Sequence, residues 1–151
     1  MSAQHVFDTA PLGALIRFSD GTPRPPDRFR RKLADWENRN GAGRLIRKSP
    51  AVDRGNSGYP ASFALHLGSY GSDGIIVLVV TRHFLVTSSL HFEIAEIPSP
   101  GSVRVLTSYG DSDELRHLAP DMASAQAWLA AHHYSNARFD VVPDPQQGRA
   151  A

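Results

Sequence analysis

The chain has 151 residues, 41% of them hydrophobic and 21% charged, and its formal net charge is +1. It has no cysteine, which excludes disulfides, thiolate nucleophiles and cysteine-based zinc sites. The longest apolar run, residues 74–80, is too short to cross a bilayer, and the N-terminal residues lack the pattern of a signal peptide. We therefore expect a cytoplasmic protein with no membrane partner.

The start of the chain predicts a strand followed by a helix. Residues 14–18 (ALIRF) predict a short strand that ends at the turn SDGTP. Phe29, Leu33 and Trp36 then recur at i, i+4 and i+7, which predicts a helix over residues 26–40. Proline is favoured at the first position of a helix. We expect the three apolar side chains of this helix to belong to the core.

Short apolar or alternating segments predict further strands. They cover residues 43–52, 61–70, 75–80, 90–97, 102–109 and 137–142. Residues 75–80 are apolar at every position, which favours a central strand covered on both faces. Residues 53–60 predict a loop, residues 81–89 have no decisive pattern, and residues 110–121 predict a loop or an irregular helix.

A second helix is predicted over residues 121–133. Ala125, Trp128, Leu129 and His132 share one face of this helix. Short turns between consecutive strands favour an antiparallel meander, which two amphipathic helices cover as a second layer. The predicted fold class is therefore α+β, as a single two-layer domain over residues 1–142, and residues 143–151 predict a disordered tail.

Four stretches of the sequence resemble a known group of proteins. They are IRFSDGTPRPPDRF, WENRNGAGRL, ASFALHLGSYGSDGIIVLVV and HLAPD…AWL, and the resemblance covers most of residues 7–142. The group comprises small uncharacterised accessory proteins carried on integrative and conjugative elements of proteobacteria. The resemblance implies a bacterial cytoplasmic accessory protein of mobile DNA, and it brings no catalytic motif.

Positive charge is concentrated in one stretch of the chain. Residues 21–48 hold nine Arg and Lys against three Asp and Glu, whereas residues 55–151 hold five against nine. The candidate nucleic-acid-binding residues are Arg24, Arg28, Arg31, Lys32, Arg47 and Lys48. Arginine suits bidentate contacts to phosphate, so DNA or RNA is the first expected partner. The same charges also fit the solvated face of an ordinary helix.

Two other classes of function stay open. The first is a protein-interaction module, an inhibitor or an assembly factor, that uses the face of the sheet or residues 81–86 (TRHFLV). The second is an enzyme that uses His66, His83 or the acids of residues 111–114 (DSDE). A metal site would require His66, His83 and His91 to converge across strands. Ser57 lacks the spacing of a nucleophile elbow. We therefore predict a binding protein that is not an enzyme and that needs no cofactor or metal.

Overall fold

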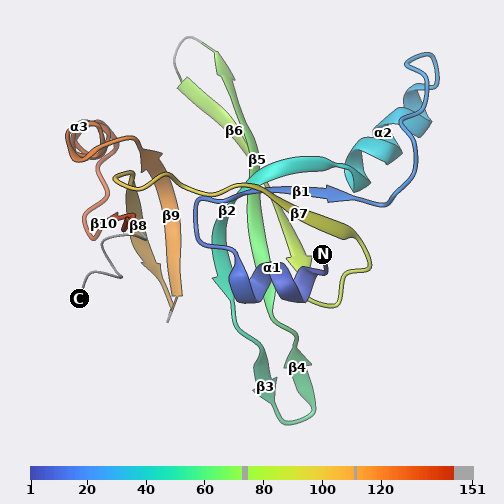
Figure 1. Cartoon of the computed structure of the whole chain (residues 1–151), viewed down its shortest axis with the longest axis horizontal. Coiled ribbons are helices and arrows are strands. Elements are labelled where there is room, and N and C mark those ends of the chain that lie inside the picture. The colour runs from blue at the N-terminus through green and yellow to red at the C-terminus, as the bar shows by residue number, and fades with distance from the viewer. Residues whose placement is uncertain (73–74, 111, 145–151) are drawn as a thin grey trace.

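The structure, a computed structural model, describes residues 1–72, 75–110 and 112–144. Within these ranges the helices are α1 (Ala3–Thr9), α2 (Arg30–Arg39) and α3 (Met122–His132). The strands are β1 (Leu15–Ser19), β2 (Gly41–Ser49), β3 (Val52–Arg54), β4 (Ser57–Tyr59), β5 (Ser62–Ser72), β6 (Ile75–Leu85), β7 (His91–Glu96), β8 (Val103–Tyr109), β9 (Ser112–Ala119) and β10 (Arg138–Val141). The α+β fold class is confirmed (Figure 1).

Strand β2 is the branch point of the larger sheet. All pairings between the described strands are antiparallel, in the order β10-β8-β9-β2-β1-β7, while β5 pairs with β2 and β6. The first half of β2 pairs with β1, and farther along the same strand Arg47 pairs with Glu114 of β9. The order departs from a simple meander, because β7 pairs with the outer edge of β1 and not with β6 or β8.

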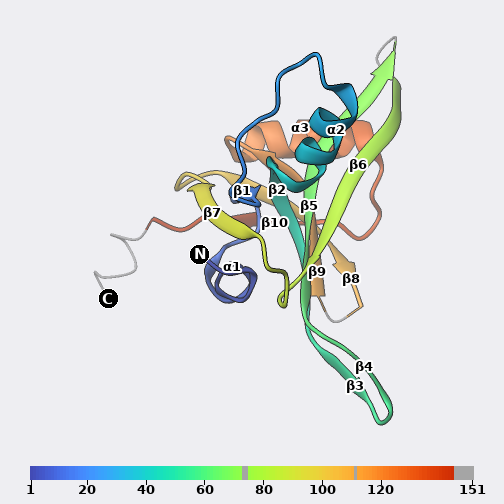
Figure 2. The same ribbon diagram turned by 90° about the vertical axis from the view of Figure 1, so that its right-hand side faces the viewer.

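Strand β6 is not the central strand that its apolar run predicts. Among the described strands it pairs with β5 alone, and the side chain of Val79 is 54% exposed. The β5–β6 hairpin extends away from the core at one end of the molecule (Figure 2). An apolar run shows that both faces of a strand are hydrophobic, but it does not show how many neighbours the strand has.

Two segments that were not predicted as strands form strands: residues 53–60, predicted as a loop, and residues 110–121, predicted as a loop or an irregular helix. Residues 53–60 contribute to the β3–β4 hairpin, whose turn uses Gly55 at a φ of +63° and whose residues are all exposed. Residues 110–121 contain β9, which pairs with β8 along its length. Charged residues interrupt the apolar pattern of β9. Only Leu115 and Ala119 of this strand are buried, so its sequence does not alternate as a half-buried strand would.

The main core surrounds four phenylalanine rings. Phe18, Phe63, Phe84 and Phe92 come from β1, β5, β6 and β7, and their ring centroids lie 4.9 to 5.7 Å apart in the contacting pairs. Helix α1 covers this core with buried Ala3 and Val6. The sequence pattern missed α1, although Ser2 caps it by accepting a hydrogen bond from the backbone N–H of His5.

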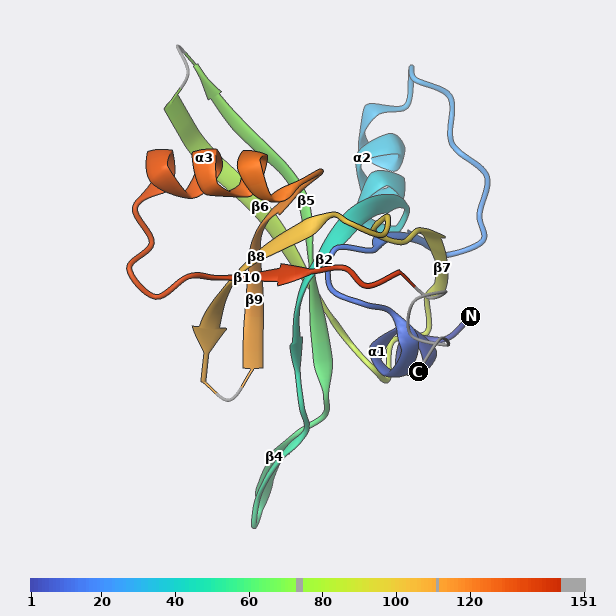
Figure 3. The same cartoon turned by 60° about the vertical axis from the view of Figure 1, so that its left-hand side comes forward.

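A second core lies under α3, whose prediction is confirmed. Ala125 of α3 packs with buried Val103, Val105 and Ala119, and Trp128 is partly buried against them. Figure 3 shows α3 lying beside β8 and β9, away from α2. The Asp121 carboxylate accepts a hydrogen bond from the backbone N–H of Ser124, which caps the helix and lowers the pKa of that carboxyl.

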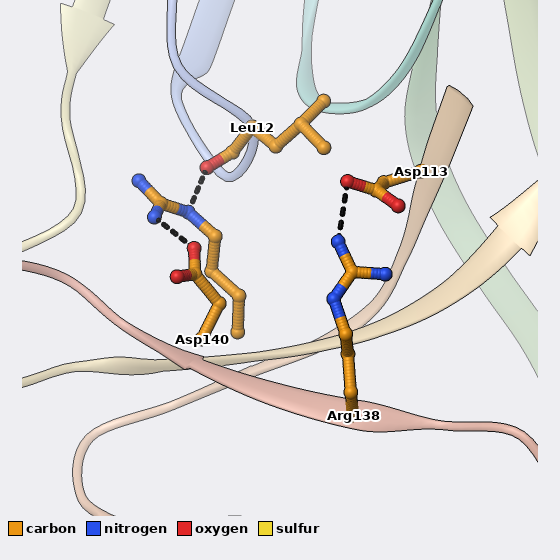
Figure 4. A network of polar contacts seen from close by, with 5 residues as sticks. Leu12, Asp113, Arg138 and Asp140 are labelled. Atoms are coloured by element: carbon orange, nitrogen blue, oxygen red, sulfur yellow. Dashed lines mark hydrogen bonds and ion pairs between the residues drawn. The ribbon is translucent and has the colours of Figure 1, made fainter. Parts of the chain in front are cut away.

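Two arginines beside the second core, Arg104 and Arg138, form ion pairs. Arg104 Nε donates to the carbonyl of Leu12 at 2.7 Å, and its Nη1 donates to Asp140 at 2.8 Å. Arg138 donates to Asp113 at 2.6 Å, which lowers the pKa of the aspartate (Figure 4). These contacts attach β10 to β8 and β9 and attach β8 to the chain before β1.

Candidate nucleic-acid interface

Helix α2 is short, basic and exposed. All ten of its residues are described, and none is buried. Its first turn carries Arg30, Arg31 and Lys32 in succession. The N-terminus of a helix is itself positive, so three cations there raise the electrostatic energy of the free helix. A bound anion would relieve this repulsion.

The helix begins four residues later than the sequence predicts, and its apolar stripe is not core. Phe29, at the N-cap position, is 42% exposed, while Leu33 and Trp36 are half-buried. Arg28 lies over the Phe29 ring at 4.8 Å and Lys32 at 5.3 Å. The spacing identified one face of a helix correctly, but three apolar residues do not decide whether that face meets the core.

A cluster of hydrogen bonds holds the C-terminal end of α2 to the end of β1. Asn40 accepts from the Ser19 hydroxyl and the Asp20 backbone N–H, and it donates to the Asp20 carboxylate and the Trp36 carbonyl. Trp36 Nε1 donates to the carbonyl of Thr22 at 2.9 Å. The cationic N-terminal end of α2 therefore points away from its attachment, toward solvent (Figure 1).

Asp20 is the charged residue of this hydrogen-bond cluster. Hydrogen bonds from the side chain and backbone of Thr22 and from Asn40 lower the pKa of Asp20 from 3.8 to about 2. A lowered pKa in the folded state means that the ionised carboxylate stabilises the fold. This contribution is complete above about pH 4 and is lost as the pH falls through about 2.

We expect Asn40→Ala to loosen α2 without unfolding the protein. The substitution removes four hydrogen bonds of the Asn40 side chain, and because water can replace the lost partners at these partly exposed groups, we expect a total loss of about 1–2 kcal/mol. Amide hydrogen exchange in α2 should become about 5- to 30-fold faster. The amides of α3 are the internal control and should not change. Unaltered exchange in α2 would show that Asn40 does not hold the helix.

The six candidate cations do not form one surface. Arg24, Arg28, Arg31 and Lys32 are exposed on α2 and the segment before it. Arg30 was not among the candidates, but it is equally exposed at the start of α2 and belongs with them. The other two candidates, Arg47 and Lys48, lie in the second half of β2, which runs away from α2 (Figure 3).

Arg47 and Lys48 are engaged within the fold. Arg47 lies 3.7 Å from Glu114, 2.6 Å from Nε2 of His83 and 4.1 Å from the centroid of the Tyr109 ring. Its side chain is only 15% exposed, and its Nε is buried with no hydrogen-bond partner among the described residues. Burial lowers the pKa of Lys48, which lies over Phe7.

The basic segment, defined here as Arg24, Arg28, Arg30, Arg31 and Lys32, differs from the cations that the fold engages, such as Arg47 and Arg104. Arg24 pairs with Asp27 at 2.7 Å, but both side chains are more than half exposed, so the pair contributes little. Between described residues, the other four cations form no ion pair within 4.0 Å. The basic segment thus combines high exposure with charge that the fold does not neutralise.

The three histidines proposed for a metal site do not converge. His66 faces a cavity of about 460 Å³ between α3 and the sheet, which Glu114, His117 and His132 also line. His83 instead contacts Arg47, and His91 lines a different cavity. Within the described ranges, no group of three or more His, Cys, Asp or Glu residues is arranged to hold a metal. Asp111 lies outside the described residues.

The α3 cavity contains an aromatic stack that the sequence did not reveal. His117 and His132 lie parallel to the Trp128 ring, at centroid distances of 4.8 and 4.0 Å. Burial, and then the neighbouring His132, lower the pKa of His117. His66 and Glu114, which belong to the enzyme hypothesis, line the same cavity. The enzyme hypothesis stays a prediction. The histidines and the glutamate that line this cavity come from α3, β5 and β9.

The fold and the surface define the class of protein: an α+β protein with a branched antiparallel sheet and an exposed cationic helix. The chain belongs to the family described as "Uncharacterised conserved protein UCP036055", whose model matches residues 1–146. Neither the curated proteins nor the solved structures include a match to the chain. Among the described residues, no helix has both the length and the hydropathy needed to span a bilayer.

Proposed function

We propose that this protein binds nucleic acid in the bacterial cytoplasm through the phosphate contacts of the basic segment. The supporting observation is that its five cations are exposed, three on α2, which has no buried residue, and two on the segment before it. Arg104 and Arg138, in contrast, are paired with carboxylates that hold strands together. Cations that contribute little to the fold are available to replace the counterions of a phosphate backbone.

The chemistry of the basic segment suits the phosphate groups of a nucleic acid. Four of its five cations are arginines, whose planar guanidinium groups bind two phosphate oxygens at once. Three of the five lie in the first turn of α2, where backbone N–H groups also point at an approaching anion. The resemblance described above implied an accessory protein of mobile DNA, and that role is part of the same proposal.

Salt-dependent binding tests the proposal. We expect labelled single- and double-stranded DNA to bind at low ionic strength in a fluorescence-anisotropy titration. Five phosphate contacts give a slope of about −3.5 to −4.5 in log K against log salt, which weakens binding roughly 100- to 500-fold between about 50 and 200 mM salt. Arg28→Glu/Lys32→Glu should weaken binding at least about tenfold at low salt and reduce the slope by about 1.5.

A matched pair of single substitutions controls for net charge. Arg31→Glu in α2 and Arg54→Glu in the exposed β3–β4 hairpin change the charge of the protein equally. The hairpin lies far from α2 (Figure 1), so Arg54→Glu should bind DNA nearly as tightly as the unaltered protein. If neither DNA binds at low salt, or if Arg28→Glu/Lys32→Glu binds normally, the proposal is wrong.

A protein-interaction module is the second candidate, and strand β6 favours it. Among the described strands β6 pairs on one edge only, and Val79 and Leu85 are 54% and 47% exposed. An unpaired apolar edge can accept a strand from another protein. This function requires no phosphate, so substitutions in the basic segment would leave it intact.

A further inference from the structure

A cavity of about 480 Å³ lies beside α2, between the helix and the edge of the sheet formed by β1 and β7. Its lining includes the aromatic residues Phe18, Trp36 and Phe92 and the polar residues Arg17, Ser19 and Glu93. Phe18 and Phe92, each 3% exposed, belong to the main core. Such a volume lies within the range of small-ligand sites. The cavity therefore combines apolar aromatic residues with a few polar groups.

Trp36 is the residue that connects this cavity with the basic segment. It lies one turn of α2 after Lys32, and both residues also line a second hollow of about 320 Å³. The hydrogen bond from Trp36 Nε1 to Thr22 fixes the indole ring, and the Asn40 contact to the Trp36 carbonyl fixes the backbone. A ring held in this way loses little freedom when another flat group stacks on it.

We propose that the Trp36 cavity holds an unpaired base of a single-stranded nucleic acid, which the basic segment binds by its phosphates. This inference rests on the proposed function and specifies its substrate. A base offers a flat apolar face for the aromatic residues and a polar edge for the polar ones. Base stacking on an aromatic side chain contributes about 5- to 150-fold in affinity and tolerates any base.

The remaining polar groups of the cavity fit the edge of a base. Ser19, Arg17 and Glu93 come from β1 and β7 and supply donors and acceptors next to the aromatic residues. Arg17 and Glu93 occupy paired positions on these strands, which places opposite charges at neighbouring positions of the cavity wall. In a duplex the bases are stacked and paired, so a base can enter this cavity only if the free energy of unpairing and unstacking it is supplied. Single strands should therefore bind more tightly than duplexes.

An abasic strand separates this inference from the proposed function. The probes are a single-stranded DNA and an abasic deoxyribose–phosphate strand of the same length and charge. With the unaltered protein, we expect the complete strand to bind about 5- to 150-fold more tightly. The protein has two tryptophans, so Trp128→Phe leaves Trp36 as the only fluorescent indole. The complete strand should quench Trp36 emission, and the abasic strand should not.

Trp36→Leu is the matching variant. It should remove the preference for the complete strand and keep the salt dependence, because the cations remain. Equal salt-dependent binding of both strands to the unaltered protein, without quenching, would overturn the base-binding inference and leave phosphate binding intact. Absence of binding to either strand would overturn both. The comparison of strands uses the unaltered protein, so it decides the inference even if a variant folds poorly.

Discussion

Phe63→Ala is expected to lower the free energy of unfolding by about 3–5 kcal/mol, the usual cost of removing a buried phenylalanine ring. Phe63 is 1% exposed, and its ring lies 5.7 Å from that of Phe84 and 5.5 Å from that of Phe92. These neighbours come from β6 and β7, which the ring joins to β5. The cavity left by alanine would remove contacts from three strands at once.

Urea unfolding monitored by circular dichroism measures this effect. Tyr59→Ala, on the exposed β3–β4 hairpin, is the control because the Tyr59 side chain is 71% exposed. It should change the free energy of unfolding by less than about 0.5 kcal/mol. A loss below about 2 kcal/mol for Phe63→Ala would mean that the phenylalanine cluster is not the main core.

Gly43→Ala is expected to destabilise the protein by about 1–3 kcal/mol, although it adds a single methyl group. An added Cβ would lie 2.7 Å from Cδ2 of Leu67, 2.9 Å from Cβ of Leu65 and 3.0 Å from the carbonyl oxygen of His66. Two of these three atoms belong to the rigid part of β5. Gly43 also pairs with Ile16 of β1, so β2 has neighbours on both edges and cannot shift away.

The same urea measurement compares Gly43→Ala with Gly58→Ala. Gly58 lies in the β3–β4 hairpin, where an added Cβ would lie 3.2 Å from the Val52 carbonyl. That hairpin is exposed and can shift, so the control should cost less than about 1 kcal/mol. Equal costs at the two positions would contradict the close packing of β5 on β2.

Patterns confined to neighbouring residues predicted the local structure well. The spacing of apolar residues located α3, and its cap at Asp121 agrees with its observed start. β1, β5, β7 and β8 also lie within one or two residues of the predicted strands. Helix α1 was missed because its seven residues are too few for a helical spacing of apolar residues to recur. Strand β9 was missed because charged residues interrupt its apolar ones.

Features that depend on distant partners could not be read from the sequence. The burial of Arg47 results from contacts with Glu114, His83 and Tyr109, which come from three other strands. The exposure of Phe29 results from the position of α2 at the end of β1, away from the main core. Charge composition alone did locate the basic segment, because four of its five residues were candidates before the fold was known.

The separation of α2 from the core has an evolutionary consequence. Residues 21–39 contain no buried residue, whereas the main core draws its side chains from α1 and the strands. Outside its attachment at Trp36 and Asn40, this segment can accept substitutions, insertions or a different charge pattern with little effect on folding. Relatives that share this scaffold can therefore diverge in what they recognise while they retain the same stability.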